Sequence, residues 1–337
     1  MRRPTGRVLA ALLTALLAGC GGGESTGTAI PVGTSLTLSL SGLRTLNAVT
    51  EGRYEAWILD RAGARTSLGV IEPGQSGVTS LANAVAQPDA FEITYELPGD
   101  ADGAPSSHRI LHGRFGGASA ELTIEGAVTE GTLSLHQRPG QFTMFSPSDN
   151  AIHGYPSFEE SGVWLFNMAP RDLPQNDMWV RLSPLQAGWV YEGWMVRDID
   201  APDAVWLSYG KFTPDATGAI RSRDDTGWGP FSGVRDFLTA GEEEFPGDDW
   251  ISNPLGYPVP GNLALPINLR EKNAQGVVRW THLITIEPAS DRGEGISKER
   301  PFVIRPYRDA FGEGGPGIPR TITFRADGVP RGSVTLR

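Results

Sequence analysis

Acidic and aromatic side chains are interspersed over one long stretch, residues 221–280, and together these residue types can bind cations or carbohydrates. The aromatic members are Trp228, Phe231, Phe237, Phe245, Trp250 and Tyr257, and the acidic members are Asp224, Asp225, Glu242, Glu243, Glu244, Asp248 and Asp249. We predict a candidate binding surface formed by Trp228, Phe231, Phe245, Asp248, Asp249 and Trp250. The alternative is that the aromatic rings fix this segment onto its domain while the acids stay in solvent.

The same acids allow a catalytic interpretation, because glycoside hydrolysis needs two carboxylates about 5–9 Å apart. A polysaccharide hydrolase would draw this pair from residues 221–262. A calcium site around Asp248 and Asp249 is another alternative, weighed against a solvated acidic loop. The chain has no Gly-x-Ser-x-Gly motif and no glycine-rich phosphate loop before a helix. We therefore favour a non-catalytic protein and assign no catalytic residue, no metal and no cofactor.

Two of the five histidines, His108 and His112, are four residues apart, as zinc ligands on a helix are. The residues between them are typical of a strand, on which these side chains would lie about 13 Å apart on one face. That distance is too long for one metal ion to bridge.

The N-terminus carries a different chemistry. Arg2, Arg3 and Arg7 precede ten apolar residues that end near Leu17, and the only cysteine, Cys20, follows Leu17-Ala18-Gly19. Ten residues of helix reach about half of a ~30 Å hydrocarbon core, so the run is typical of a signal peptide. The motif resembles the lipobox of bacterial lipoproteins, which implies that Cys20 is acylated. An ordinary signal peptide with a chance cysteine is the alternative.

This resemblance assigns residues 1–20 to a lipoprotein signal peptide and lipobox. The glycine-rich sequence that follows predicts a flexible tether at residues 21–33. It implies a lipoprotein anchored to a membrane of the cell envelope, with the outer membrane favoured and a periplasmic or surface-facing body. Several acyl chains, each methylene adding ~0.8 kcal/mol, would hold it there.

Charge excludes one class of partner. The formal net charge is −10, and residues 1–19 contribute three arginines and no acid, so the remainder carries −13. Such a surface repels phosphate backbones, and we predict no nucleic-acid binding. A single cysteine also excludes a disulfide framework.

The body of the chain contains a degenerate duplication, which we identify from five blocks in the same order. Residues 54–59 (YEAWIL) match 191–196 (YEGWMV), 67–73 match 208–214, and 93–96 (ITYE) match 284–287 (ITIE). Residues 109–115 roughly parallel 303–308, and 122–135 resemble 322–336. We predict two homologous domains, 34–140 and 141–337, the second with an insertion at about 221–280.

Short strands make up both domains. Residues 36–40, 91–97 and 133–135 alternate apolar and polar side chains, residues 283–286 are strand-like and more apolar, and glycine- and proline-rich turns lie between such segments. This pattern predicts an all-β protein of two tandem antiparallel β-sandwiches. One short helix is predicted at residues 80–86.

Four aromatic residues at matching positions have predicted structural roles. Trp57 and Trp194 are expected in the core. Tyr54 and Tyr191 fall on the opposite strand face, where each hydroxyl would cap a loop or face solvent. Glu55 and Glu192 are expected in structural ion pairs or hydrogen bonds, and Gly69 and Gly210 predict a bulge or a close backbone approach.

The blocks YEAWIL, SLGVIEP and FEITYELPGD resemble the extracytoplasmic C-terminal domain of anti-sigma-K-type factors. The resemblance covers about residues 36–115 and 160–308 and implies a small β-sandwich in each. It does not carry sigma-factor binding, because the helical sigma-binding domain and membrane helix of those proteins have no counterpart here.

These observations predict a non-catalytic envelope lipoprotein that binds or scaffolds an envelope protein or polymer. The alternatives are an envelope polysaccharide hydrolase and a structural or stress-related envelope component without a ligand.

Overall fold

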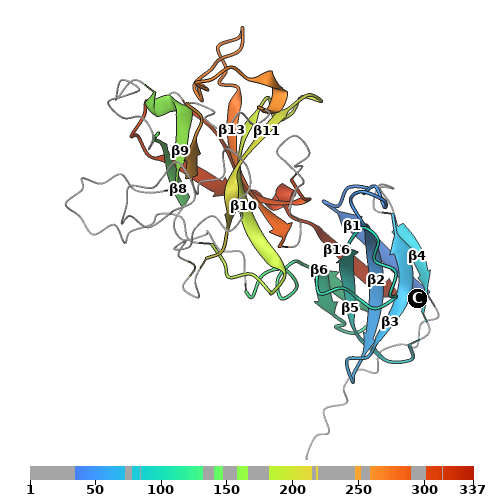
Figure 1. Ribbon diagram of the computed structural model, residues 1–337. Coiled ribbons are helices and arrows are strands. Elements are labelled where there is room, and N and C mark those ends of the chain that lie inside the picture. Colours follow the sequence, from blue (N-terminus) through green and yellow to red (C-terminus); the bar gives the residue numbers. More distant parts are fainter. Residues whose placement is uncertain are drawn as a thin grey trace, which may run out of the picture.

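Antiparallel β-strands form the framework of the described chain, in a computed structural model that describes residues 35–72, 78–83, 85–131, 140–146, 158–165, 182–214, 218, 247–251, 259–289, 301–312 and 314–337. The only helical segments within these residues are three short 3-10 turns, η1 (Glu159–Ser161), η2 (Pro260–Asn262) and η3 (Ala326–Gly328). The prediction of an all-β, antiparallel fold is confirmed. The strands gather in two lobes (Figure 1).

The first lobe is a sandwich of two four-stranded sheets. One has the order β4-β1-β16-β7, formed by β4 (Val78–Ala82), β1 (Ser35–Ser41), β16 (Arg331–Leu336) and β7 (Ser119–Leu122). The other has the order β3-β2-β5-β6, formed by β3 (Arg65–Ile71), β2 (Arg53–Asp60), β5 (Pro88–Glu96) and β6 (Arg109–Arg114). Alternating apolar residues of β1, such as Leu36 and Leu38, are buried against side chains of the second sheet, as the period-2 pattern predicts.

The second lobe is built on one eight-stranded sheet that curves into a half-barrel. Its order is β11-β10-β13-β14-β15-β8-β9-β12. The strands are β11 (Val205–Phe212), β10 (Trp189–Arg197), β13 (Trp280–Pro288), β14 (Ile304–Ala310), β15 (Arg320–Phe324), β8 (Gly140–Met144), β9 (Gly162–Trp164) and β12 (Gly247–Asp249). Part of the predicted insertion, β12, therefore forms an edge of this sheet by pairing with β9.

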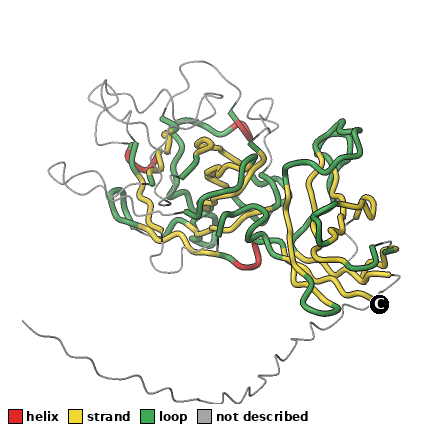
Figure 2. The backbone as a smooth tube through the Cα atoms, turned by 90° about the horizontal axis from the view of Figure 1, so that it is seen from below, coloured by secondary structure: helices red, strands yellow, loops and turns green. Residues whose placement is uncertain are grey.

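The C-terminal strand departs from the predicted domain order. The predicted boundary assigns residues 141–337 to the second domain, but β16 is hydrogen-bonded to β1 and to β7 of the first lobe. The C-terminus lies at the edge of that lobe (Figure 2). Strand β16 supplies the middle of its sheet, so the first lobe contains both early and late parts of the sequence. The predicted strand at residues 133–135 lies outside the described residues.

The helix predicted at residues 80–86 is also wrong. Residues 78–82 form β4, which pairs with β1 through Leu81 opposite Leu36. A free sheet edge beside β1 gives this segment backbone hydrogen bonds that two turns of isolated helix cannot match.

The bulges predicted from Gly69 and Gly210 are confirmed. The register of β2 with β3 shifts between Ala56 and Trp57, and that of β10 with β11 shifts between Gly193 and Trp194. Gly69 and Gly210 lie opposite these shifts, with φ of 95° and 115°. Residues with a β-carbon rarely adopt this backbone conformation.

Aromatic rings join the two lobes. Tyr95 of β5 packs edge-on against Phe302, with centroids 4.9 Å apart, and the ring of His108 lies 5.6 Å from that of Trp189. Backbone hydrogen bonds from Gln186 to Val128 and from Glu130 to Pro184 add to the contact. Burial lowers the pKa of His108, which favours its neutral form within this junction.

Candidate functional site

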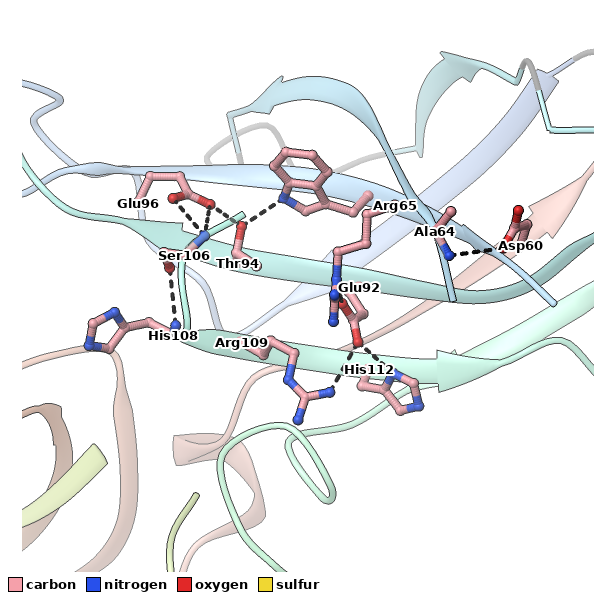
Figure 3. A network of polar contacts seen from close by, with 11 residues as sticks. Asp60, Ala64, Arg65, Glu92, Thr94, Glu96, Ser106, His108, Arg109 and His112 are labelled. Atoms are coloured by element: carbon pink, nitrogen blue, oxygen red, sulfur yellow. Dashed lines mark hydrogen bonds and ion pairs between the residues drawn. The ribbon is translucent and has the colours of Figure 1, made fainter. Parts of the chain in front are cut away.

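The outer face of the sheet β3-β2-β5-β6, which is the face turned away from the sandwich core, carries a network of polar contacts (Figure 3). Strand register places its members side by side: Trp57 of β2 pairs with Glu92 of β5, and Glu92 pairs with His112 of β6. Because side chains two residues apart share a face, Thr94 and Glu96 follow Glu92 along the same side of β5.

Glu92 lies at the centre of a cationic cluster, which we define as Arg65, Arg109 and His112. Arg65 donates from Nε to Glu92 Oε2 at 2.9 Å, and Arg109 donates from Nη1 to Oε1 at 3.1 Å. His112 Nδ1 lies 3.3 Å from Oε1. Burial by itself raises the pKa of Glu92, but the contacts with His112, Arg65 and Arg109 outweigh it and lower the pKa to about 2. The carboxylate is therefore ionised at neutral pH.

Exposure differs sharply within the cluster. The Glu92 side chain is 1% exposed, whereas the side chains of Arg65, Arg109 and His112 are 36%, 29% and 23% exposed. A guanidinium has five N–H donors. Among the described residues, each of the two guanidinium groups uses one nitrogen on Glu92 and has no second hydrogen-bond partner. The N–H donors of the arginines therefore face solvent, whereas the carboxylate of Glu92 does not.

A second network lies beside the cluster on β2 and β5. The indole N–H of Trp57 donates to Thr94 Oγ1 at 2.8 Å, and the Thr94 hydroxyl donates to Glu96. The backbone N–H of Ser106 donates to both carboxyl oxygens of Glu96. Burial raises the pKa of Glu96. This Trp–Thr–Glu relay ties the loop after β5 to the sheet.

The second lobe repeats the relay. Trp194 Nε1 donates to Thr285 Oγ1 at 3.0 Å, the Thr285 hydroxyl donates to Glu287, and the Phe302 N–H donates to both Glu287 oxygens at 2.9 Å. Trp194, Thr285 and Glu287 occupy the positions that the predicted duplication aligns with Trp57, Thr94 and Glu96. The same hydrogen-bonded relay is thus found in both lobes.

The cationic cluster is not repeated. Leu283 pairs with Trp194 where Glu92 pairs with Trp57, and Trp206 stands opposite Val196 where Arg65 stands opposite Leu59. Leu283, Trp194 and Val196 form an apolar cluster with Ile199, Ala204 and Trp206. Arg305 stacks over Trp206 at 5.1 Å, and Arg308 binds the exposed Asp200.

The four structural aromatics are all buried, on two different faces. Trp57 and Trp194 lie in small clusters on the outer faces, and Tyr54 and Tyr191 lie in the main core. Tyr191 donates to the loop carbonyl of Ser183 at 2.9 Å, as a loop cap does. Tyr54 is 1% exposed and its hydroxyl has no partner among the described residues, so our expectation for it is wrong. The reason is that the face of β2 that carries Tyr54 packs against the opposing sheet of the sandwich.

Glu55 of β2 and Glu192 of β10, for which we predicted structural contacts, both have polar partners. Glu55 accepts from Ser67, while Glu192 accepts from Ser208 at 2.7 Å and lies 3.8 Å from Lys211 Nζ. The same serines accept from the N–H groups of Gly69 and Gly210, which fixes each bulge.

Most of the predicted binding surface lies outside the described residues. This holds for Trp228, Phe231 and Phe245, and for the side chain of Asp248, whose backbone belongs to β12. Asp249 and Trp250 are 3% and 0% exposed, so a surface role is wrong for these two. Trp250 packs in the main core, and its backbone binds Ser161 and Ile267, because this part of the segment is held on the half-barrel.

His108 and His112 lie on different faces, contrary to the even spacing. The register of β5 with β6 shifts between Ile93 and Thr94, so that Ile110 is an extra residue and the alternation is broken. His108 turns to the lobe junction and His112 to Glu92. Arg65, Glu92 and Arg109 were not predicted from the sequence. One feature could have identified Glu92: it is a charged residue between Phe91 and Ile93, and it lies on the same sheet face as Trp57.

No protein-family model matches this chain, and neither the curated proteins nor the solved structures contain a significant match to it. Within the described residues, no three His, Cys, Asp or Glu side chains converge in a way that could hold a metal ion. The same residues include no helix long and apolar enough to cross a membrane.

Proposed function

We propose that the protein is a non-catalytic lipoprotein of the bacterial cell envelope, anchored by a lipid on Cys20, which binds or scaffolds another envelope component. The observation that carries the proposal is the position of the only cysteine, directly after Leu17-Ala18-Gly19 at the end of the apolar run. Residues 1–34 lie outside the described residues. The anchor is therefore supported by the sequence alone, as is the preference for the outer membrane.

The contacts of three enclosed glutamates support the proposal of binding over catalysis. Glu96 and Glu287 are held by backbone N–H groups and threonine hydroxyls, and Glu92 is held by two arginines. General acid–base catalysis needs a proton donor or acceptor within reach of a substrate. His282 is fully enclosed, bonded to Tyr209 at 2.8 Å, and burial lowers its pKa to about 3.

The alternative of a polysaccharide hydrolase depends on the acids of residues 221–262. Of these, Asp249 alone has a described side chain, and it is buried. A structural or stress-related component, with a fold related to anti-sigma-factor sensor domains, needs no ligand at all. We favour binding because the cationic cluster presents unused donors to solvent on a rigid sheet.

The anchor is tested by fractionating cells that express the wild-type protein or Cys20→Ala. We expect the wild type to sediment with membranes and the variant to be released in the periplasmic fraction. If Cys20→Ala still partitions with membranes, the lipid anchor is wrong. The binding role is tested by crosslinking intact envelopes and isolating the protein: a reproducible partner supports it, and the absence of any partner favours the purely structural alternative.

A further inference from the structure

We propose that the cationic cluster on the outer face of β3-β2-β5-β6 is a binding site for an oxyanion group, a carboxylate, phosphate or sulfate carried by the ligand. Arg65 and Arg109 would bind the group directly, with His112 at its edge. The inference rests on the binding role proposed above but not on the lipid anchor, and it names the chemistry that the first lobe recognises.

Charge and position favour an anion. Glu92 neutralises one of the two guanidinium charges, which leaves a net positive charge at this point of the sheet even with His112 neutral. In the next row, Arg114 is paired with Asp89 and adds no net charge. The protein as a whole is acidic, but at physiological salt its distant acids are screened beyond about 8 Å. The nearest surface charge therefore determines what binds.

The two arginines are preorganised for such a ligand. Glu92 is enclosed and accepts from both guanidinium groups, so it holds them next to each other at the junction of β3, β5 and β6 (Figure 3). Each contact uses one nitrogen, Nε of Arg65 and Nη1 of Arg109. The remaining N–H groups include pairs that match the oxygen spacing of a carboxylate or phosphate. Little side-chain entropy is lost when a ligand binds donors that are already fixed.

The second lobe shows that strands in this register fold without an acid at the position of Glu92 and without an arginine at the position of Arg65. Its equivalent positions hold Leu283 in place of Glu92 and Trp206 in place of Arg65, on the same strand register and with the same Trp–Thr–Glu relay. The loop between β10 and β11 also contributes Ile199 and Ala204 to the apolar cluster there. A buried ion cluster is often no more stable than apolar residues of similar volume. A role in ligand recognition accounts for charges that packing does not require.

The experiment measures anion binding to the full-length chain in detergent micelles. The Nε–Hε NMR signals of its arginines are followed while sodium chloride is replaced by sodium phosphate, and separately by sodium acetate, at constant ionic strength. We expect saturable shifts of the Arg65 and Arg109 signals, with millimolar dissociation constants for the isolated anions. The stronger of the two anions distinguishes a phosphate ligand from a carboxylate ligand.

Variants locate the site. Arg65→Gln and Arg109→Gln should each weaken binding about tenfold or more, because each removes a charged hydrogen-bond donor. Arg308→Gln is the matched control, since Arg308 occupies the position of His112 in the second lobe, and it should change nothing. If Arg65→Gln does not give a folded spectrum, Arg65→Lys keeps the charge and removes the planar fork.

The proposal is overturned if tens of millimolar phosphate and acetate leave the Arg65 and Arg109 signals unmoved. It is equally overturned if the NMR signals of Arg305 and Arg308 shift as much as those of Arg65 and Arg109, since that result indicates general ion pairing. A negative titration together with a reproducible envelope partner would reject the oxyanion site and leave the binding role standing. Saturable binding by a protein that fractionates without membranes would reject the anchor instead.

Discussion

Replacing Glu92 by Gln removes the negative charge that holds Arg65 and Arg109 together while keeping the size and shape of the side chain. The pKa of Glu92 falls from the ordinary value of 4.5 to about 2 in the folded protein. Since a tenfold change in proton affinity corresponds to about 1.4 kcal/mol, the ionised carboxylate stabilises the fold by roughly 3 kcal/mol. Partial exposure of the cations screens the interaction, so we expect a loss of about 2–3 kcal/mol at neutral pH.

The pH dependence follows from the direction of the pKa change. A carboxyl group with a lowered pKa in the folded state contributes fully above its unfolded pKa, and the contribution disappears as the pH falls through the folded value. The stability difference between wild type and Glu92→Gln should therefore be constant above about pH 6 and shrink by about 1–2 kcal/mol by about pH 3. Urea unfolding of both proteins at several pH values measures it, and other carboxyl groups cancel in the difference.

Glu271→Gln is the control for a solvent-exposed carboxylate. Glu271 also binds two arginines, Arg197 and Arg279, but its side chain is 36% exposed. We expect this substitution to cost less than about 1 kcal/mol. A cost of that small size for Glu92→Gln, or a difference from wild type that is the same at acidic and neutral pH, would refute the reasoning about the enclosed charge.

Two further predictions concern the framework. Thr94→Val and Thr285→Val should each cost about 1–3 kcal/mol, because each leaves an enclosed indole N–H without an acceptor and removes one donor from a buried carboxyl group; thermal unfolding with Thr321→Val as an exposed control measures this. Deletion of residues 331–337 should remove the hydrogen-exchange protection of β1 and β7 but not of β10, because β16 lies between β1 and β7.

Each of these predictions has a clear contradicting outcome. A near-normal melting temperature for both threonine variants would mean that water replaces the hydroxyl and that the relay is not structural. Unchanged exchange in β1 after the deletion would mean that the first lobe is complete without its C-terminal strand, as the predicted domain boundary at residue 140 requires.

Several strands of the first lobe, β1 among them, could be predicted because burial on one face imposes a period of two, whereas the segment that contains part of β4 was predicted as a helix. Leu36 and Leu38 of β1 follow this period, and the matching blocks around Trp57 and Trp194 led to the bulges at Gly69 and Gly210. The position of β16 could not be predicted in this way. Alternation shows that a segment is a strand and which residues share a face, but it does not state which distant strand supplies the backbone partners.

The candidate site shows the same limit at the level of side chains. Charged residues on separate strands meet only through register, and one extra residue in β6 moved His108 to the lobe junction and left His112 beside Glu92. Sequence reasoning gave most weight to aromatic and acidic residues in one continuous segment, of which Asp249 and Trp250 are buried. Glu92 and the cationic cluster around it come from three strands, each contributing one or two residues.

Comparison of the two lobes separates the residues that both sheets share from those that one lobe alone carries. Both keep the tryptophan, threonine and glutamate of the relay, together with the serine and glycine at the bulge, so these residues are explained by the geometry of the sheet. Next to them, one copy has Glu92 and Arg65 and the other has Leu283 and Trp206. Strands with the same register and the same bulge carry both sets. A difference in ligand recognition between the lobes is the explanation that anion binding at Arg65 and Arg109 would establish.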